Sequence, residues 1–302
     1  MKSALHIIDM SPVVYAGTYN KRSLIPAPEP VMTADGYRER YIPTGGTSML
    51  FNILAQYMGT GDIVFVADRS PTIKREIRSS YKSQKSPNQL VQVSKEVAEY
   101  ILTDCGFDVL YRDGYEADDV IANLVEQYYK QYDCIFVHTG DSDLYILVDD
   151  KVSILPTSSV AKLVHMDNYS TVCKAGVTTM YNTVVWNKFI SGDSGKDIPA
   201  LSAAAVEKIR KTIRVTPEYA KHFGNWRYMR SLFEKVLPDF FDRLQLFYPL
   251  PIDEPLPIGG QGDKGRIREW ASLIRNKKIP AKEPHLDKEV DELFERGLYL
   301  ES

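Results

Sequence analysis

Short apolar segments that alternate with helix-like segments constrain the fold of this chain more than any other feature of its sequence. Apolar runs typical of buried strands occupy residues 4–9, 62–68, 107–111, 133–138 and 151–156. The segments between them space their apolar residues as helices do, as in residues 93–106. Strands that alternate with helices are typical of an α/β fold, in which helices cover both faces of a largely parallel central sheet. We therefore predict that fold class.

This alternation stops near residue 178. Beyond it, strand-like runs disappear and helical segments with basic faces dominate. We therefore expect an α/β domain over residues 1–177 and a helical domain over residues 178–302. Two stretches rich in Pro and Gly interrupt the pattern. We expect residues 20–46 to form a long loop and residues 249–265 to form a connection within the second domain.

Cysteine and histidine usage narrows the function classes. The 302 residues include three cysteines without a Cys-x-x-Cys pair and five scattered histidines. This usage argues against a disulfide framework and against a zinc enzyme, and it suits a reducing cytoplasm. The sequence has no apolar run long enough to cross a membrane and no secretory signal pattern. We therefore expect a cytoplasmic protein without a membrane partner.

Acidic residues follow each of the first four predicted strands. They are Asp9, Asp68, Glu116, Asp118, Asp119, Asp141 and Asp143. Taken alone, each is more often a turn residue or a helix cap than a functional group. In an open α/β sheet, however, functional groups collect beyond the carboxyl ends of the strands. We therefore expect these carboxylates to converge in one crevice.

Converging carboxylates predict a metal centre. Two like charges 4 Å apart repel by about 4 kcal/mol at an effective dielectric constant near 20, and bound cations lower that cost. Oxygen ligands without histidine or cysteine select Mg²⁺ or Mn²⁺. Two such ions roughly 4 Å apart form the arrangement that supports phosphodiester hydrolysis. A further acidic pair, Asp193 and Asp197, lies on a turn that the sheet pattern does not place.

Basic residues cluster although the net charge of the chain is −3. The basic segments are residues 72–85, 207–214 and 263–282. Any one of them is more often a solvated helix face, but several together indicate contacts with phosphate groups.

Motifs along the chain resemble the 5′-nuclease, or flap endonuclease, family, which includes the 5′-nuclease domain of bacterial DNA polymerase I and phage 5′→3′ exonucleases. The motifs are IID (7–9), FVAD (65–68), YKSQK (81–85), YEADDVIA (115–122), TGDSDLYILVDDKVSI (139–154) and SGDSGKDIPA (191–200). They occur in the family's order, and the likeness covers roughly residues 1–210.

The resemblance implies a PIN-like 5′-nuclease fold with a helical arch and a helix-three-turn-helix in the C-terminal domain. It implies a metal-dependent, structure-specific 5′→3′ exonuclease or flap endonuclease of DNA replication or repair, with RNase H-like primer removal as a related activity. The implied partner is DNA with a 5′ flap, a nick or a 5′ end. An RNA–DNA hybrid and replication proteins are further candidate partners. We expect a monomer, located in the host cytoplasm if a phage encodes it.

The resemblance also assigns residues to the site. The implied metal ligands are Asp9, Asp68, Glu116, Asp118, Asp119, Asp141, Asp143, Asp193 and Asp197. The implied catalytic residues are Lys82, Lys85, Asp68 and Asp118, with Lys82 at the scissile phosphate. The candidate DNA-binding residues are Lys74, Arg75, Arg78, Tyr81, Lys82, Lys85, Lys196, Lys208, Arg210, Lys211 and Arg214. For Tyr81, stacking on a base and packing within the arch are alternative roles.

The resemblance implies two bound divalent ions, each Mg²⁺ or Mn²⁺. The sequence departs from the family pattern at the residues that would hold the second ion. The family commonly has GDSSDNIPG where this chain has GDSGKDIPA, so Lys196 stands at the position of the second acid and Asp197 follows one residue later. Either the turn presents Asp197 or Lys196 acts as a fixed cation. The stretch SAAAVEK (202–208) has alanines where the family has glycines. A monovalent cation near residues 200–206 is therefore in question.

Two other functions remain open. The chain could bind branched DNA without cleaving it, a reading that the Lys196 departure favours. It could also be a PIN-type ribonuclease, although the basic segment at residues 72–85 and the long C-terminal half are unusual for that class.

Overall fold

The chain forms two compact units, each assembled from three stretches of sequence. The first unit contains Met1–Ile8, Asp68–Ser86 and Leu110–Pro257, and the second contains Asp9–Ala67, Pro87–Val109 and Ile258–Ser302. The structure is a computed structural model that describes residues 2–19, 23–27, 31–83, 88–157, 163–165, 183–213, 226–277 and 284–301. The predicted domain boundary at residues 177/178 lies outside the described residues.

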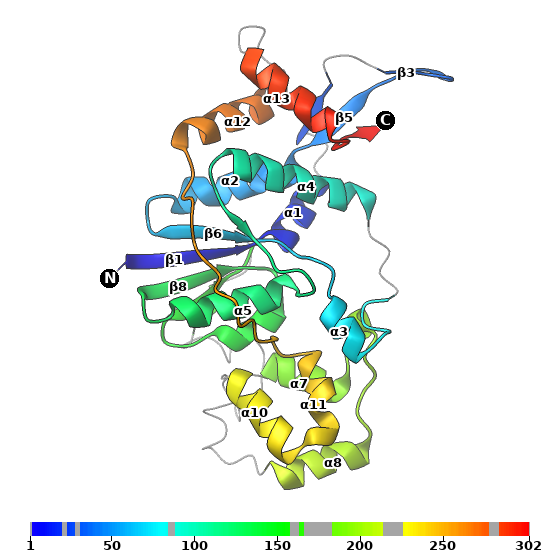
Figure 1. Ribbon diagram of the computed structural model, residues 1–302, viewed down its shortest axis with the longest axis vertical. Helices are drawn as coiled ribbons and strands as arrows, with labels where there is room; N and C mark the ends of the chain where they lie inside the picture. Colours follow the sequence, from blue (N-terminus) through cyan, green and yellow to red (C-terminus); the bar gives the residue numbers. More distant parts are fainter. Residues whose placement is uncertain are drawn as a thin grey trace. The chain divides into compact units, whose positions relative to one another are not determined.

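Five strands form the central sheet in the order β7-β6-β1-β8-β9 (Figure 1). The strands are β1 (Lys2–Asp9), β6 (Asp62–Val66), β7 (Val109–Leu110), β8 (Tyr132–His138) and β9 (Val152–Leu155). In the first unit, β1 pairs in parallel with β8, and β8 pairs in parallel with β9. Ile7, Val137 and Ile154 lie side by side across these strands and are fully buried. The predicted α/β class with a largely parallel sheet is confirmed.

The helices of the first unit follow the strands and continue beyond them. They are α3 (Thr72–Ile77), α5 (Ala117–Tyr128), η2 (Ser142–Leu147), α7 (Thr183–Ser191), η4 (Ser194–Lys196), α8 (Ala203–Thr212), α10 (Trp226–Val236), η5 (Pro238–Phe240) and α11 (Phe241–Gln245). Phe189 of α7 packs against the rings of Trp186, Phe233 and Phe247, with centroids 5.1–6.2 Å apart. This aromatic cluster is a core for the helices near the end of the first unit.

The predicted connection at residues 249–265 begins as an extended strap that is bound to α5. The side chain of Asn123 donates to the carbonyl of Leu250 and accepts from the amide of Ile252. One turn later, the side chain of Gln127 makes the same paired contacts with the backbone of Leu256. Two amide side chains on one face of α5 therefore satisfy the backbone of a segment that has no regular secondary structure.

The second unit contains three mutually packed helices and two small sheets. The helices are α1 (Met10–Thr18), α2 (Gly45–Tyr57) and α4 (Gln89–Asp104), followed by α12 (Lys264–Asn276) and α13 (Pro284–Glu295). Gly17 and Gly45 allow α1 and α2 to approach closely, because a Cβ on Gly17 would lie 2.4 Å from the Gly45 carbonyl oxygen. One antiparallel sheet joins β2 (Leu24–Pro26), β5 (Arg40–Pro43) and β10 (Leu300–Glu301).

The expectation of a long loop at residues 20–46 is wrong for the described part of that stretch. In addition to β2 and β5, it contains the hairpin of β3 (Val31–Thr33) and β4 (Gly36–Arg38). Each strand has only three or four residues, too few to show a clear alternation against a background rich in Pro and Gly. Helix α2 begins at Gly45 after Thr44, so its first two residues also lie within the predicted loop.

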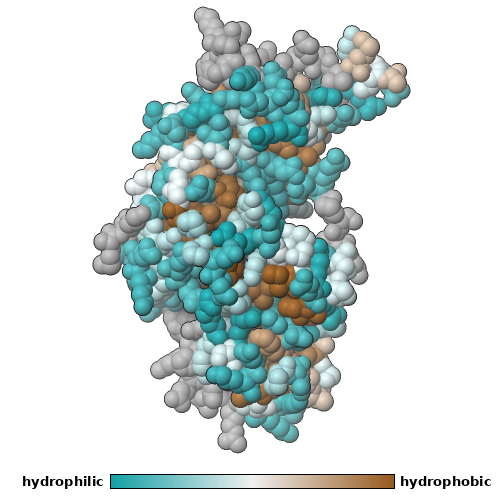
Figure 2. All heavy atoms as spheres, in the orientation of Figure 1, coloured by the Kyte–Doolittle hydropathy of each residue, from teal (hydrophilic) through white to brown (hydrophobic). Residues whose placement is uncertain are grey.

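The visible surface is mostly hydrophilic, with brown areas separated by teal atoms (Figure 2). No helix within the described residues has the length and apolar character needed to cross a membrane.

Candidate metal centre

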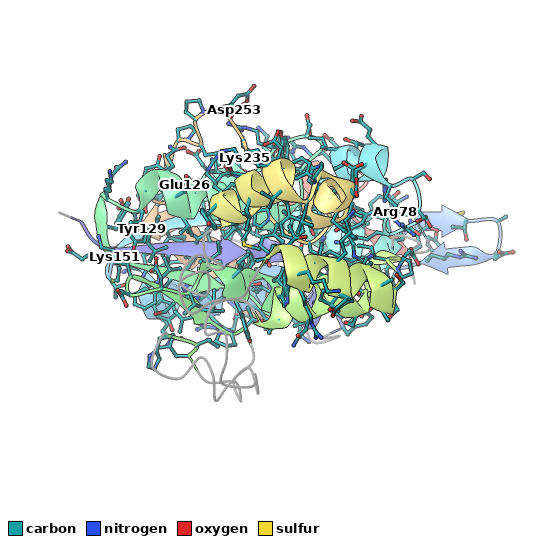
Figure 3. All side chains as sticks on the ribbon, turned by 90° about the horizontal axis from the view of Figure 1, so that it is seen from below. Arg78, Glu126, Tyr129, Lys151, Lys235 and Asp253 are labelled. Carbon is teal, nitrogen blue, oxygen red and sulfur yellow. The ribbon has the colours of Figure 1, made fainter. Side chains whose placement is uncertain are left out.

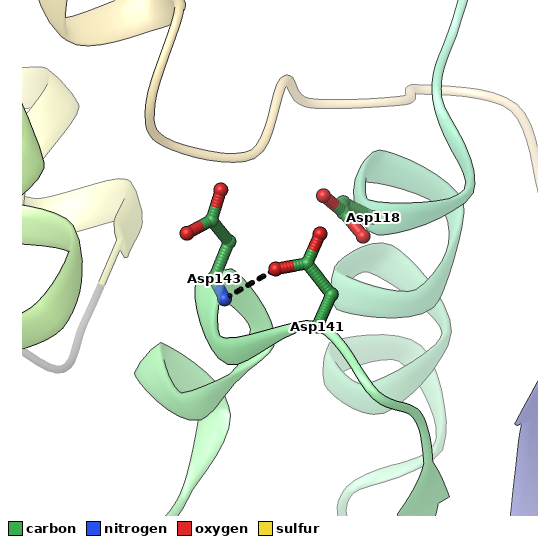
Figure 4. Close-up of side chains that lie close together, drawn as sticks. All are labelled: Asp118, Asp141 and Asp143. Carbon is green, nitrogen blue, oxygen red and sulfur yellow. Dashed lines mark hydrogen bonds between the residues drawn. The ribbon is translucent and has the colours of Figure 1, made fainter. Parts of the chain in front are cut away.

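Three carboxylates meet where α5 and η2 begin. Asp118 lies in the first turn of α5, Asp141 is the N-cap of η2, and Asp143 lies in the first turn of η2. Each offers one carboxylate oxygen, and these three oxygens lie within 4.8 Å of one another. Figure 4 shows the three carboxyl groups turned toward a common space. Among the described residues, this is the group of at least three potential ligands with the spacing of a metal site.

Local hydrogen bonds hold the η2 side of this group. The Thr139 hydroxyl accepts from the amide of Asp141 at 3.0 Å, and the Asp141 carboxylate accepts from the amide of Asp143 at 2.9 Å. The sequence TGDSD therefore folds into a turn that caps a short helix and aims both aspartates to one side. One oxygen of Asp141 takes no part in these two bonds, and Asp141 and Asp143 each contribute an oxygen to the three-aspartate group.

The start of α5 receives two further carboxylates. Asp68 accepts from the amide of Ala117 at 2.8 Å, and Asp119 accepts from the amide of Glu116 at 3.0 Å. The other oxygen of Asp119 accepts from the amide of Leu250 at 2.8 Å. The first two contacts satisfy amide groups at the N-terminus of α5, which have no intrahelical partners, and the third binds the strap at Leu250.

A buried ion-pair network surrounds Glu116. The Lys74 ammonium lies 2.8 Å from Glu116 and 3.0 Å from Asp119, and all three side chains are at most 4% exposed. Glu116 also accepts from the Tyr81 hydroxyl at 2.8 Å and pairs with Lys82. Burial disfavours the charged form of Glu116, but the nearby lysines outweigh it and hold the pKa of the Glu116 carboxyl well below its usual range. The same contacts raise the pKa of Lys74 despite its burial.

Two predicted DNA contacts need correction. Lys74 and Tyr81 were predicted to contact DNA, but Lys74 is 3% exposed and Tyr81 is fully buried. Both side chains instead point inward to Glu116. Tyr81 therefore packs inside the unit, which was the alternative to base stacking. Glu116 and Asp119 were expected to hold metal. In the structure, both carboxylates contact Lys74 and accept further hydrogen bonds. Their role as metal ligands stays a prediction.

A second pair of lysines holds Asp143. Lys188 of α7 pairs with one oxygen of Asp143 and lies 3.7 Å from Asp193, while the Lys196 ammonium lies 2.7 Å from the other oxygen of Asp143. Lys196 is 8% exposed. Burial opposes the charge of Asp143, but Lys196 and Lys188 outweigh it and lower the pKa of that carboxyl. Lys188 carries no sequence motif, and its role was not predicted.

Three further predicted acids lie at helix ends. Asp9 belongs to the second unit and caps α1 by accepting from the amide of Ser11. Asp193 caps η4 by accepting from the amide of Gly195, and Asp197 ends η4 in a left-handed conformation with φ 57°. Lys85 and Arg214 lie outside the described residues.

The basic side chains of the first unit that remain at its surface make local contacts. Arg75 donates to the Ser70 hydroxyl and Arg78 to the Ser80 hydroxyl. In Figure 3, Arg78 lies on the side of the view away from Tyr129 and Lys151. The exposed basic residues of α8 are Lys208, Arg210 and Lys211, of which Lys208 pairs with Asp239 and Lys211 with Glu207. These surface pairs are weak and can yield to a phosphate.

Comparison with known proteins identifies the family. A family model described as 5′-3′ exonuclease, N-terminal resolvase-like domain, matches residues 4–180. The chain therefore belongs to the 5′-3′ exonuclease family, and the resemblance drawn from the motifs is confirmed.

Two curated relatives support this assignment. The chain is 35% identical over 158 residues to a 5′-3′ exonuclease of Aquifex aeolicus, an alignment that covers 50% of each protein. It is 26% identical over 236 residues to DNA polymerase I of Caldicellulosiruptor bescii, which covers 76% of this chain and 28% of the polymerase. The chain thus aligns with half the length of the first relative and with a smaller part of the second.

Solved structures share the fold. The T5 D15 protein, co-crystallized with metal ions, has a TM-score of 0.51 and 15% identity, with 91% of this chain and 99% of that chain covered. Human GEN1 in complex with Holliday junction DNA has a TM-score of 0.50 and 14% identity, with 91% and 68% covered. At these identities the likeness concerns the fold alone.

Proposed function

We propose that the chain is a metal-dependent 5′→3′ nuclease that hydrolyses phosphodiester bonds in DNA with a 5′ flap, a nick or a 5′ end. The observation that carries the proposal is the convergence of Asp118, Asp141 and Asp143 within the segment that matches the family. The names of the relatives, which include 5′-3′ exonucleases and DNA polymerase I, support a role in DNA replication or repair.

The donor chemistry of the three aspartates fits a hard divalent cation. All the ligand atoms are carboxylate oxygens, and they are close enough to share one ion. Asp118, Asp141 and Asp143 would hold Mg²⁺ or Mn²⁺. When bound, the ion supplies Lewis-acid stabilisation of the negative charge that develops during phosphodiester hydrolysis.

Among the described basic residues, we expect Lys82 to meet the phosphate. Its side chain is 27% exposed, whereas its partner Glu116 is 4% exposed. The backbone of Lys82 is left-handed, with φ 51°, a conformation that costs energy for a residue other than glycine and often marks functional positions. The ammonium can donate to a phosphate oxygen and stabilise the charge that builds up there in the transition state. Glu116 holds the Lys82 ammonium in the charged form and in place.

We expect the Lys82→Ala variant to cleave about 10²–10³-fold more slowly, the loss typical of removing one preorganised electrostatic group. Its affinity for DNA should fall much less, because one phosphate contact is a small part of the total. Single-turnover cleavage and fluorescence anisotropy measure the two quantities. Arg78→Ala is the matched control, since it removes a basic side chain from the same segment that donates to Ser80 instead of pairing with Glu116. Equal losses of rate and affinity in Lys82→Ala would reduce Lys82 to a general phosphate contact.

Metal dependence tests the proposed function directly. We expect a 5′-labelled flap substrate and a matched nicked duplex to release short 5′ products with Mg²⁺ or Mn²⁺ and to stay intact with EDTA. An RNA–DNA hybrid in a third reaction tests primer removal. Binding without cleavage in either metal would instead support a non-catalytic DNA-binding protein. The lysine contacts with Asp143 favour that second candidate.

A further inference from the structure

Both oxygens of Asp143 accept from lysines that come from separate elements. Lys188 extends from the last turn of α7 and contacts one oxygen, and Lys196 extends from η4 and contacts the other at 2.7 Å. We call Lys188 and Lys196 the lysine clamp. The clamp lies beside the three-aspartate group, because Asp143 belongs to both.

The clamp is built into the fold. Lys196 is 8% exposed, and burying an ammonium group is costly unless anionic partners compensate for the lost hydration. The turn fixes its direction, since Asp193 caps η4 at one end and Asp197 leaves it in the left-handed region at the other. The Lys196 carbonyl also accepts from the amide of Lys82 at 3.4 Å. Lys196 is therefore held from both its backbone and its side chain.

The charges of the two lysines balance those of the acids that they contact. Asp143 and Asp193 carry two negative charges, and Lys188 and Lys196 together carry the positive charge of one divalent ion. A carboxylate offers about four lone-pair positions. The clamp uses two of those of Asp143, which leaves room for one ion shared with Asp118 and Asp141 and opposes a second ion on the side of Asp193.

We propose that the lysine clamp takes the place of a second divalent ion, so that this chain binds one ion where the sequence resemblance implied two. This inference rests on the proposed function for the role of the remaining ion. Two fixed ammonium groups supply positive charge and hydrogen-bond donors toward a phosphate. They need no metal on that side of Asp143, and they keep Asp143 oriented before any ion binds.

The number of Mn²⁺ ions bound per chain tests the proposal without reference to cleavage. We expect isothermal titration calorimetry and Mn²⁺ electron paramagnetic resonance to find one ion on the unmodified full chain. The double variant Lys188→Gln, Lys196→Asp removes the clamp and places a carboxylate beside Asp143 and Asp193, so it should bind two. The single variant Lys196→Asp, with Lys188 retained, should bind a second ion more weakly than the double variant.

The matched control for Lys196→Asp is Lys130→Asp, which makes the same charge change at an exposed lysine beyond the far end of α5 and should keep one ion. Two ions on the unmodified chain would overturn the clamp proposal and leave the proposed nuclease function standing. A double variant that is folded by circular dichroism yet binds one ion would also overturn it. No bound ion on the unmodified chain, together with no cleavage, would overturn the proposed function as well.

Discussion

The Asp118→Asn variant should cleave a 5′-flap substrate about 10³-fold more slowly than the unmodified chain. The substitution keeps the shape of the side chain but removes an anionic oxygen from the group of three aspartates. Metal-ion catalysis contributes several kcal/mol of transition-state stabilisation, and each 1.36 kcal/mol corresponds to a factor of about ten in rate. Single-turnover cleavage at saturating Mg²⁺ measures the loss.

DNA binding by Asp118→Asn should stay equal or become tighter, because the substitution removes a negative charge that would repel the phosphates of bound DNA. Fluorescence anisotropy in EDTA measures the affinity. Asp113→Asn is the matched control, since Asp113 is exposed and precedes α5 in the same segment, and we expect it to cleave at the normal rate. A rate for Asp118→Asn within tenfold of this control would refute the assignment of the metal centre.

The Lys74→Met variant should lose about 3 kcal/mol of unfolding free energy, at the lower end of the 3–5 kcal/mol that is typical when one partner of a buried ion pair is removed. Methionine fills the space of the lysine stem but leaves Glu116 and Asp119 buried with less compensation. The lower end applies because Glu116 keeps Lys82 and Tyr81, and Asp119 keeps two amide donors. Urea denaturation measures the change.

Two comparisons isolate the ion pair. Lys130→Met, at an exposed position, should change stability by no more than about 0.5 kcal/mol. Adding Asp119→Asn to Lys74→Met removes one of the two buried charges that Lys74 compensates, so the losses of the two single variants should not add. The double-mutant cycle gives the coupling between the two residues. If Lys74→Met matched the Lys130→Met control, the network around Glu116 would have no structural role.

The sequence predicted the parallel sheet because its signal is local. Apolar runs such as residues 133–138 carry the strand pattern within themselves, and β8 has nearly those bounds. The short strands within residues 20–46 were not predicted, because each has only three or four residues and forms only by pairing with another short strand. β5, for example, pairs with β10, which lies at the other end of the chain. The amino-acid composition of such a stretch does not indicate which short segments pair as strands.

The sequence predicted which types of residue form the candidate metal centre, but only part of what each residue does there. Acids after strands pointed to Asp118, Asp141 and Asp143, which do converge. The pattern could not show which acids meet lysines, because the contacts join distant positions. Lys74 is 42 residues from Glu116, and Lys188 is 45 residues from Asp143. A basic run such as residues 72–85 contains both inward and outward side chains, and spacing alone did not separate Lys74 from Arg75.

The interleaving of the two units has a consequence for synthesis on the ribosome. The second unit is complete only when Ile258–Ser302 has been made, although its other stretches end at Val109. At about 5–20 residues per second, the roughly 150 residues between these points take roughly 7–30 s. During that interval α2 has emerged without α12, which packs against it in the finished unit. The nascent chain therefore exposes apolar helix surface for seconds, the situation in which chaperones engage their clients.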